Sequence, residues 1–222
     1  MSSLRSLLTV GALAGALAAT TSPLSAQTLL TNSFAGIIAT DFGGACGGPG
    51  TCFGSGPVAV GTNGISAMFT SSHGNGAYGP GAYGVGSNGF WSHPSWAGSN
   101  GAFESVFIDF ASAVTMVGGF MNYSPGLGTP WLVAWNGATE IGSWNLASAA
   151  PISTPGASNG GAFRGVEYAG GITRLELRGG FLITQDLVVE GTPASVPEPA
   201  MLSLVGLGGL GLMVRSRRRR FA

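Results

Sequence analysis

The chain has 222 residues, 40 of them glycine, and nine basic residues balance nine acidic ones. Six of the basic residues lie outside residues 27–195, so that region carries three arginines, no lysine and eight acidic residues, a net charge of −5. A surface with so little positive charge has no basic footprint for nucleic acid, which argues against nucleic-acid binding as a function class.

The first 26 residues have the layout of a secretory signal peptide. Arg5 supplies a positive n-region, Leu7–Ala19 is a run of apolar and small residues, and Pro23–Ala26 ends in a small residue. The apolar run is too short for a stable membrane helix, which needs about 20 residues. We therefore predict cleavage by signal peptidase after Ala26 and export of residues 27–195, a length that suits one domain.

Cys46 and Cys52 are the only cysteines, and both lie in the exported region. An oxidising compartment favours a disulfide between them. The five residues between them are flexible enough for closure, although a loop this short contributes less stability than a long one. A metal site is the alternative, but the sequence has no second Cys or His pair at ligand spacing, so we expect none.

Residues 43–101 are rich in glycine, serine and asparagine and show no helical period. Short apolar pieces such as Pro57–Val60 and Gly64–Thr70 are typical of strands between glycine-rich turns. The pattern G-x-G-x-x-G begins at Gly74, Gly84 and Gly206, but in no case does it lie between a predicted strand and a helix. We therefore reject dinucleotide binding and expect no cofactor.

From residue 101 onward, apolar and β-branched runs alternate with turn signals, and Asn136-Gly137 is a strong hairpin turn. This pattern, with no amphipathic helix, predicts an all-β fold, an antiparallel β-sandwich with a glycine-rich N-terminal half. The expected strands are Phe103–Phe110, Val114–Tyr123, Trp131–Trp135, Thr139–Leu146, Ala162–Tyr168, Ile172–Arg178 and Phe181–Glu190.

Alternation along these strands assigns side chains to faces. Leu175 and Leu177 are expected to point inward, and Arg174, Glu176 and Arg178 to share the outer face, where opposite charges form weak pairs. Trp131, Val133 and Trp135 share one strand face, for which core packing is the expected role.

Trp91 and Trp96 are the candidate contact surface for a glycan. They flank Ser92–Ser95 in a predicted loop, where burial is less obligatory than in a strand. Flat aromatic faces can stack on sugar rings, so we expect these two indoles to be exposed for such a contact.

No catalytic residue is assigned. His73 and His93 are the only histidines, and no G-x-S-x-G nucleophile motif occurs. Glu104 and Asp109 are expected to face opposite sides of one strand. A pairing of Asp109 with Glu140 across strands is left open, because glycoside hydrolysis needs two carboxyls about 5–10 Å apart.

The last 27 residues, 196–222, have three parts: the segment Val196-Pro197-Glu198-Pro199, an apolar run Met201–Val214, and a tail with Arg215, Arg217, Arg218, Arg219 and Arg220. Two prolines keep the first part extended and open to a processing enzyme. The apolar run is shorter than the about 20 residues that span a bilayer comfortably, and the arginines hold the tail on the cytoplasmic side. An ordinary tail anchor is the alternative, but it does not require Pro-Glu-Pro at its outer edge.

This three-part tail closely resembles the PEP-CTERM sorting signal of exopolysaccharide-producing Gram-negative bacteria. The resemblance implies a C-terminal membrane helix and processing by an exosortase, a membrane-embedded cysteine peptidase that cuts near Pro-Glu-Pro. It also implies transient anchoring in the inner membrane, followed by a place on the cell surface or in the extracellular matrix. The strand order between Phe107 and Val189 is similar to the jelly-roll bodies of such proteins, which resemble lectin-like carbohydrate-binding modules.

We therefore expect an exported, exosortase-processed protein that is a non-catalytic, carbohydrate-associated binding or structural component of a biofilm or its exopolysaccharide. A secreted enzyme acting on extracellular polysaccharide is the alternative. A third interpretation is a structural filler whose glycine-rich half packs or self-associates.

Overall fold

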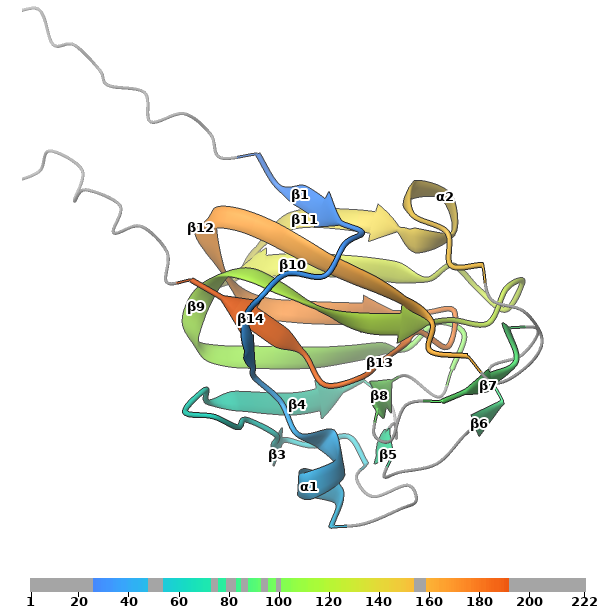
Figure 1. Ribbon diagram of the computed structural model, residues 1–222, viewed down its shortest axis with the longest axis horizontal. Coiled ribbons are helices and arrows are strands. Elements are labelled where there is room, and N and C mark those ends of the chain that lie inside the picture. The colour runs from blue at the N-terminus through green and yellow to red at the C-terminus, as the bar shows by residue number, and fades with distance from the viewer. Residues whose placement is uncertain are drawn as a thin grey trace, which may run out of the picture.

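The computed structural model describes residues 26–47, 54–72, 76–78, 83–84, 88–92, 96–98, 101–153 and 159–191. The predicted signal peptide, apart from Ala26, and the tail from Val196 onward lie outside these ranges. The described chain is mostly β, with two short helices, α1 (Phe42–Cys46) and α2 (Leu146–Ala149) (Figure 1). The predicted all-β fold is confirmed.

Twelve strands form one antiparallel sheet, and β6 and β7 form a separate two-stranded sheet. The strands are β1 (Thr28–Leu30), β2 (Ile37–Ile38), β3 (Val58–Ala59), β4 (Ala67–Ser71), β5 (Gly76–Tyr78), β6 (Tyr83–Gly84), β7 (Phe90–Trp91), β8 (Trp96–Gly98), β9 (Ser105–Asn122), β10 (Trp131–Asn136), β11 (Thr139–Asn145), β12 (Ala162–Arg178), β13 (Ile183–Thr184) and β14 (Val188–Glu190).

Two long strands, β9 and β12, run through both layers of the sandwich. They pair with each other along most of their length, and the register breaks between Glu167 and Ile172. The first half of β9 pairs with β4, and its second half pairs with β13 and β14. Likewise the first half of β12 pairs with β1, and its second half pairs with β10. Both strands fold back at the break, so the single sheet forms the two layers of the predicted antiparallel sandwich (Figure 1).

The sequence pattern predicted two separate strands in place of each of these long strands. The structure instead continues β9 through Ala111-Ser112-Ala113 and β12 through Gly170-Gly171. Small residues allow this sharp bend, and Gly171 has a φ of 93°, which disfavours any residue with a Cβ. A bend within a strand and a turn between two strands therefore have the same signature in the sequence.

The core lies between the two layers and follows the register of β10 and β12. Leu175 and Leu177 are fully buried in it, as predicted. Leu132 lies opposite Leu177 and Ala134 opposite Leu175, so these two residues of β10 share the inward face. Trp131, Val133 and Trp135 lie together on the opposite face of β10, and the predicted core role is wrong for the two tryptophans. Val133 is buried there, whereas both tryptophans are partly exposed.

The two ends of the sandwich differ in which parts of the long strands they contain. The bend end holds the fold-back of β9 and β12 together with Glu190, the last residue of β14, which lies opposite Met116 of β9. The open end holds the termini of the two long strands. There Ser124 N–H donates to Gly180 O at 2.9 Å, and Gly180 N–H donates to Ala102 O at 3.0 Å, which ties together the loops on either side of β9 and after β12.

The face assignment of β10 can be tested by comparing two truncations in the exported domain. Leu132→Ala should lower the free energy of unfolding by roughly 2–5 kcal/mol, because it leaves a cavity in the core. Trp131→Ala removes a larger side chain but should cost only roughly 1–2 kcal/mol, because that indole is partly in water already. Urea titration followed by circular dichroism measures both values. If Trp131→Ala is the costlier change, the face assignment is wrong.

Candidate functional site

The outer face of the layer formed by β11, β10, β12 and β9 gathers aromatic and charged side chains that lie far apart in the sequence. Residues opposite each other in the register share a face, so one set of side chains can be read across the strands. The set comprises Trp131, Val133 and Trp135 on β10, Arg174, Glu176 and Arg178 on β12, and Ser105, Phe107 and Asp109 on β9.

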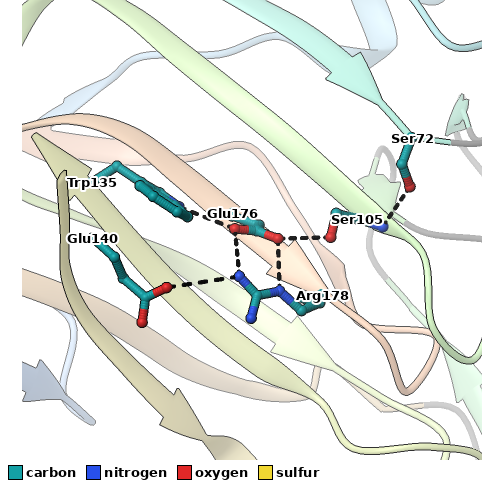
Figure 2. Close-up of polar contacts among 6 residues, drawn as sticks. All are labelled: Ser72, Ser105, Trp135, Glu140, Glu176 and Arg178. Atoms are coloured by element: carbon teal, nitrogen blue, oxygen red, sulfur yellow. Dashed lines mark hydrogen bonds and ion pairs between the residues drawn. The ribbon is translucent and has the colours of Figure 1, made fainter. Parts of the chain in front are cut away.

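Glu176 is the centre of this face. The residue is only 2% exposed. Its carboxylate accepts hydrogen bonds from Ser105 Oγ at 2.6 Å and from Trp135 Nε1 at 3.0 Å (Figure 2). Arg178 donates through Nε at 2.8 Å and through a terminal nitrogen at 2.9 Å, so the ion pair is bidentate. The weak, exposed pair that sequence analysis expected is therefore a buried carboxylate with four donors.

These contacts set the charge state of Glu176. Burial alone raises the pKa of a carboxyl group, because the charged form loses water. Hydrogen bonds from Arg178, Ser105 and Trp135, with the positive charge of Arg178, outweigh that effect and bring the pKa of Glu176 below the ordinary value of 4.5. Glu176 is therefore ionised at neutral pH and holds Trp135 and Arg178 in fixed positions.

A shallow pocket of about 220 Å³ lies beside this cluster, at the open end of the sandwich. Phe103 and Trp131 supply its aromatic walls, and Arg178 and Thr129 supply polar groups. Phe103 is 84% exposed, which is unusual for so large an apolar side chain. We call this feature the Phe103–Trp131 pocket.

Arg178 links the buried cluster to the pocket. The guanidinium has five N–H groups, of which Glu176 accepts two, and Glu140 Oε2 lies 3.9 Å from a terminal nitrogen. Hydrogen bonding and the charge of Glu176, together with Glu140, raise the pKa of Arg178 in spite of its partial burial. Arg178 is therefore held in a fixed position beside the pocket, and its charge is already balanced.

The other two arginines of the described chain also have protein partners. Arg174 Nε lies 2.6 Å from Asp109 Oδ1, and its guanidinium lies 4.9 Å from the centre of the Phe107 ring. Arg164 is buried and donates to the main-chain oxygens of Ala150, Pro151 and Phe163. Burial lowers the pKa of Arg164, although Tyr123 acts in the opposite direction.

Trp91 and Trp96 do not form the exposed surface that the sequence predicted. Trp91 is 0% and Trp96 is 7% exposed, and both pack with Ile183 in a small second core cluster beside Phe120. The physical reason is that Trp91 ends the short strand β7 and Trp96 begins β8, which joins the main sheet through Gly98 opposite Ile183. Both indoles are buried, whereas Phe103 is exposed and Trp131 is partly exposed.

The remaining predicted site residues are placed as follows. Cys46 ends α1, whose first turn is capped by Asp41 Oδ1 at 2.6 Å from Gly44 N, and Cys46 is disulfide-bonded. Cys52, His73 and His93 lie outside the described residues, so the pairing of Cys46 with Cys52 stays a prediction. Within the described ranges, no group of three His, Cys, Asp or Glu side chains could hold a metal ion.

The carboxylate pair left open by the sequence, Asp109 with Glu140, is not brought together. Glu140 lies opposite Trp135, Trp135 opposite Arg174, and Arg174 opposite Asp109. Three strand spacings amount to roughly 14 Å between the backbones. Trp135 and Arg174 lie between the two acids, and Asp109 is ion-paired with Arg174, so the register does not place the two carboxyl groups side by side.

The sorting residues Val196–Pro199 and the five arginines from Arg215 lie outside the described residues. In the ranges that are described, no helix is long and apolar enough to cross a membrane.

Comparison with known proteins finds one family model that matches part of the chain. The family model for the PEP-CTERM protein-sorting motif matches residues 195–219. No curated protein and no solved structure shows a significant match to the chain. The match includes the Pro-Glu-Pro segment, the apolar run and most of the arginine tail, so the predicted recognition is confirmed. The chain carries an exosortase-dependent signal for export and C-terminal membrane anchoring.

Glu176→Gln tests the buried ion pair. The amide keeps the shape of the side chain but leaves Arg178 without its counter-charge, so the free energy of unfolding at neutral pH should fall by roughly 2 kcal/mol. The pKa of Glu176 is lower in the folded protein, so its contribution is present above the unfolded pKa and is lost as the pH falls through the folded pKa. The native chain should therefore lose stability below about pH 4.5 more steeply than the variant.

Urea titrations at a series of pH values measure this difference. Glu167→Gln is the matched control, because Glu167 is an exposed carboxylate on the same strand. Equal acid slopes for the native chain and the Glu176→Gln variant would show that Glu176 does not carry this linkage.

The sorting motif predicts the mass of the mature protein. We expect the released form to lack Arg217–Arg220, and deletion of Val196–Pro199 to leave the chain in the membrane. Intact-mass measurement of the released protein decides the first point, and fractionation of the deletion variant decides the second. A released species that still carries the arginine tail would contradict the processing scheme.

Proposed function

We propose that the mature protein is a non-catalytic component of the cell surface or extracellular matrix that associates with the exopolysaccharide of a biofilm. The observation that carries this proposal is the Phe103–Trp131 pocket, which combines an exposed Phe103 ring, a partly exposed Trp131 indole and Arg178 held in place by Glu176. The export signal supports the proposal, because exopolysaccharide lies outside the cell.

The shape and chemistry of the pocket suit a sugar residue. One face of a pyranose ring is made largely of C–H groups, which pack on aromatic rings, while its hydroxyl groups need hydrogen-bonding partners. Phe103 and Trp131 supply the rings, and Arg178 and Thr129 supply polar groups at the same site. A few polar groups in an otherwise apolar pocket are the usual means of orienting a small ligand.

Charge favours a neutral polysaccharide over an anionic one. Arg178 is balanced by Glu176 and lies near Glu140, and Arg174 is paired with Asp109. Arg164 is buried and bound to main-chain oxygens. A contact made by stacking and neutral hydrogen bonds should survive moderate salt, because screening weakens exposed ion pairs.

The state of Glu176 supports binding over the alternative of a polysaccharide-cleaving enzyme. A general acid in glycoside hydrolysis needs a carboxyl with a raised pKa that can donate a proton. The pKa of Glu176 is lowered, and both of its oxygens accept hydrogen bonds from neighbouring side chains. Glu176 is therefore suited to positioning its neighbours and not to proton transfer.

Retention on immobilised exopolysaccharide from the producing organism tests the proposal. Phe103→Ala and Trp131→Ala should each weaken retention by roughly tenfold, because each removes one stacking surface. The native chain should stay bound as salt is raised. Ile37→Ala is the matched control, since Ile37 is 52% exposed but lies on β2, which pairs with β14 near the bend end.

The other outcomes separate the competing functions. Release of reducing ends from the polymer would favour the enzyme. Retention that vanishes at modest salt, or that both aromatic variants leave intact, would retire the Phe103–Trp131 pocket as the binding site. Absence of any retention would favour the structural filler.

A further inference from the structure

An apolar groove of about 460 Å³ lies at the bend end, opposite to the Phe103–Trp131 pocket. Its walls come from β2, from the turn before β4, from the bend of β9 and from the end of β14; they include Ile37, Ile65, Ala113, Val114, Val189 and Gly191. Ile37, which lines the groove, is 52% exposed, and its neighbour Ile38 on β2 is 50% exposed. We call the groove and these two isoleucines the bend-end surface.

Exposed apolar surface of this kind is typical of sites that contact a protein, a membrane or a ligand. Glu190 is the one charged residue among the described residues that line the groove. A highly charged partner therefore finds little to bind here. An apolar or zwitterionic surface fits the chemistry better.

The position of the C-terminal tail indicates which apolar or zwitterionic surface lies close to the groove. Gly191 forms part of the groove wall, and only the nine residues from Thr192 to Ala200 separate it from Met201, the first residue of the apolar run. The ten Cα-to-Cα steps from Gly191 to Met201 extend to about 36 Å at most. While the sorting signal anchors the chain, the bend-end surface is therefore held within that distance of the bilayer.

So short a tether also raises the effective concentration of the body at the membrane. Linkers this short give local concentrations on the order of millimolar, so a contact too weak to act between free molecules is populated while the tether is intact. Cutting the tether removes that advantage. Membrane contact would then end when the sorting signal is removed.

We infer that the bend-end surface rests on the lipid bilayer while the sorting signal is anchored, and leaves it after cleavage. In this orientation the bend of β9 faces the membrane. The Phe103–Trp131 pocket, at the other end of the long strands, faces away from it. The surface is apolar, so the contact requires no anionic lipid.

NMR signals of the isoleucine methyl groups test this inference without any probe attached to the protein. The full chain is anchored through its own tail in a phosphatidylcholine nanodisc that contains a lipid with a paramagnetic headgroup. The methyl signals of Ile37, Ile38 and Ile65 should broaden strongly. Those of Ile152 and Ile183 should not, because Ile152 N–H binds Tyr123 and Ile183 pairs with Asn122, both at the open end. Added salt should change neither result.

A double substitution supplies the second arm. Ile37→Thr with Ile38→Thr keeps β-branched residues in β2 but removes apolar area, so membrane contact should fall by roughly tenfold, as read from the Ile65 methyl group. Leu127→Thr is the matched control, because Leu127 is 51% exposed and lies in the loop after β9 at the open end. It should leave the broadening of Ile65 unchanged.

Each remaining outcome would overturn the inference and name another occupant. Ile37 and Ile65 signals that do not respond to the paramagnetic lipid, but shift when the tail is deleted, would show that the groove holds the chain's own tail. Shifts that depend on protein concentration would indicate a second copy. Equal broadening at both ends of the sandwich would show that the anchored body has no preferred orientation.

Discussion

The pairing of β9 with β12 is the constraint on which the rest of the structure depends. One half of each strand lies in one layer and the other half lies in the second layer. The two layers therefore cannot separate without breaking the hydrogen bonds between β9 and β12, the longest strand pairing among the described residues. The fold-back also decides where every other element can attach. It places β4 and β10 in one layer and β1 and β14 in the other, and it leaves four strand ends together at the open end.

Alternation in the sequence identified residues that share a face but not which face looks inward. For β12 the choice was simple, because leucines alternate with charged residues. For β10 both faces are apolar, with Leu132 and Ala134 on one side and Trp131, Val133 and Trp135 on the other. The register against Leu175 and Leu177 resolves the ambiguity, and register is a long-range property that no local pattern contains.

The contacts of the candidate site are also long-range, so a local sequence pattern does not predict them. Glu176 looked like one charge in an exposed alternating row, since a lone acidic residue carries no sign of its partners. Its burial depends on Ser105, 71 residues away, and on Trp135, 41 residues away. Trp91 and Trp96 were misplaced for a related reason: strands of two or three residues in a glycine-rich stretch have no detectable period. The sorting signal was recognisable because its three parts are contiguous.

The short strand β14 also has a mechanical consequence. It is hydrogen-bonded to β2 on one side and to β9 on the other, and Thr115 Oγ1 donates to Glu190 O at 2.9 Å at its last residue. A pull on the chain beyond Gly191 acts along the axis of β14, so these bonds are loaded together in shear. A strand peeled from an edge instead loses its bonds one at a time. Tension from the anchored end is thus shared with β9 and spreads into both layers.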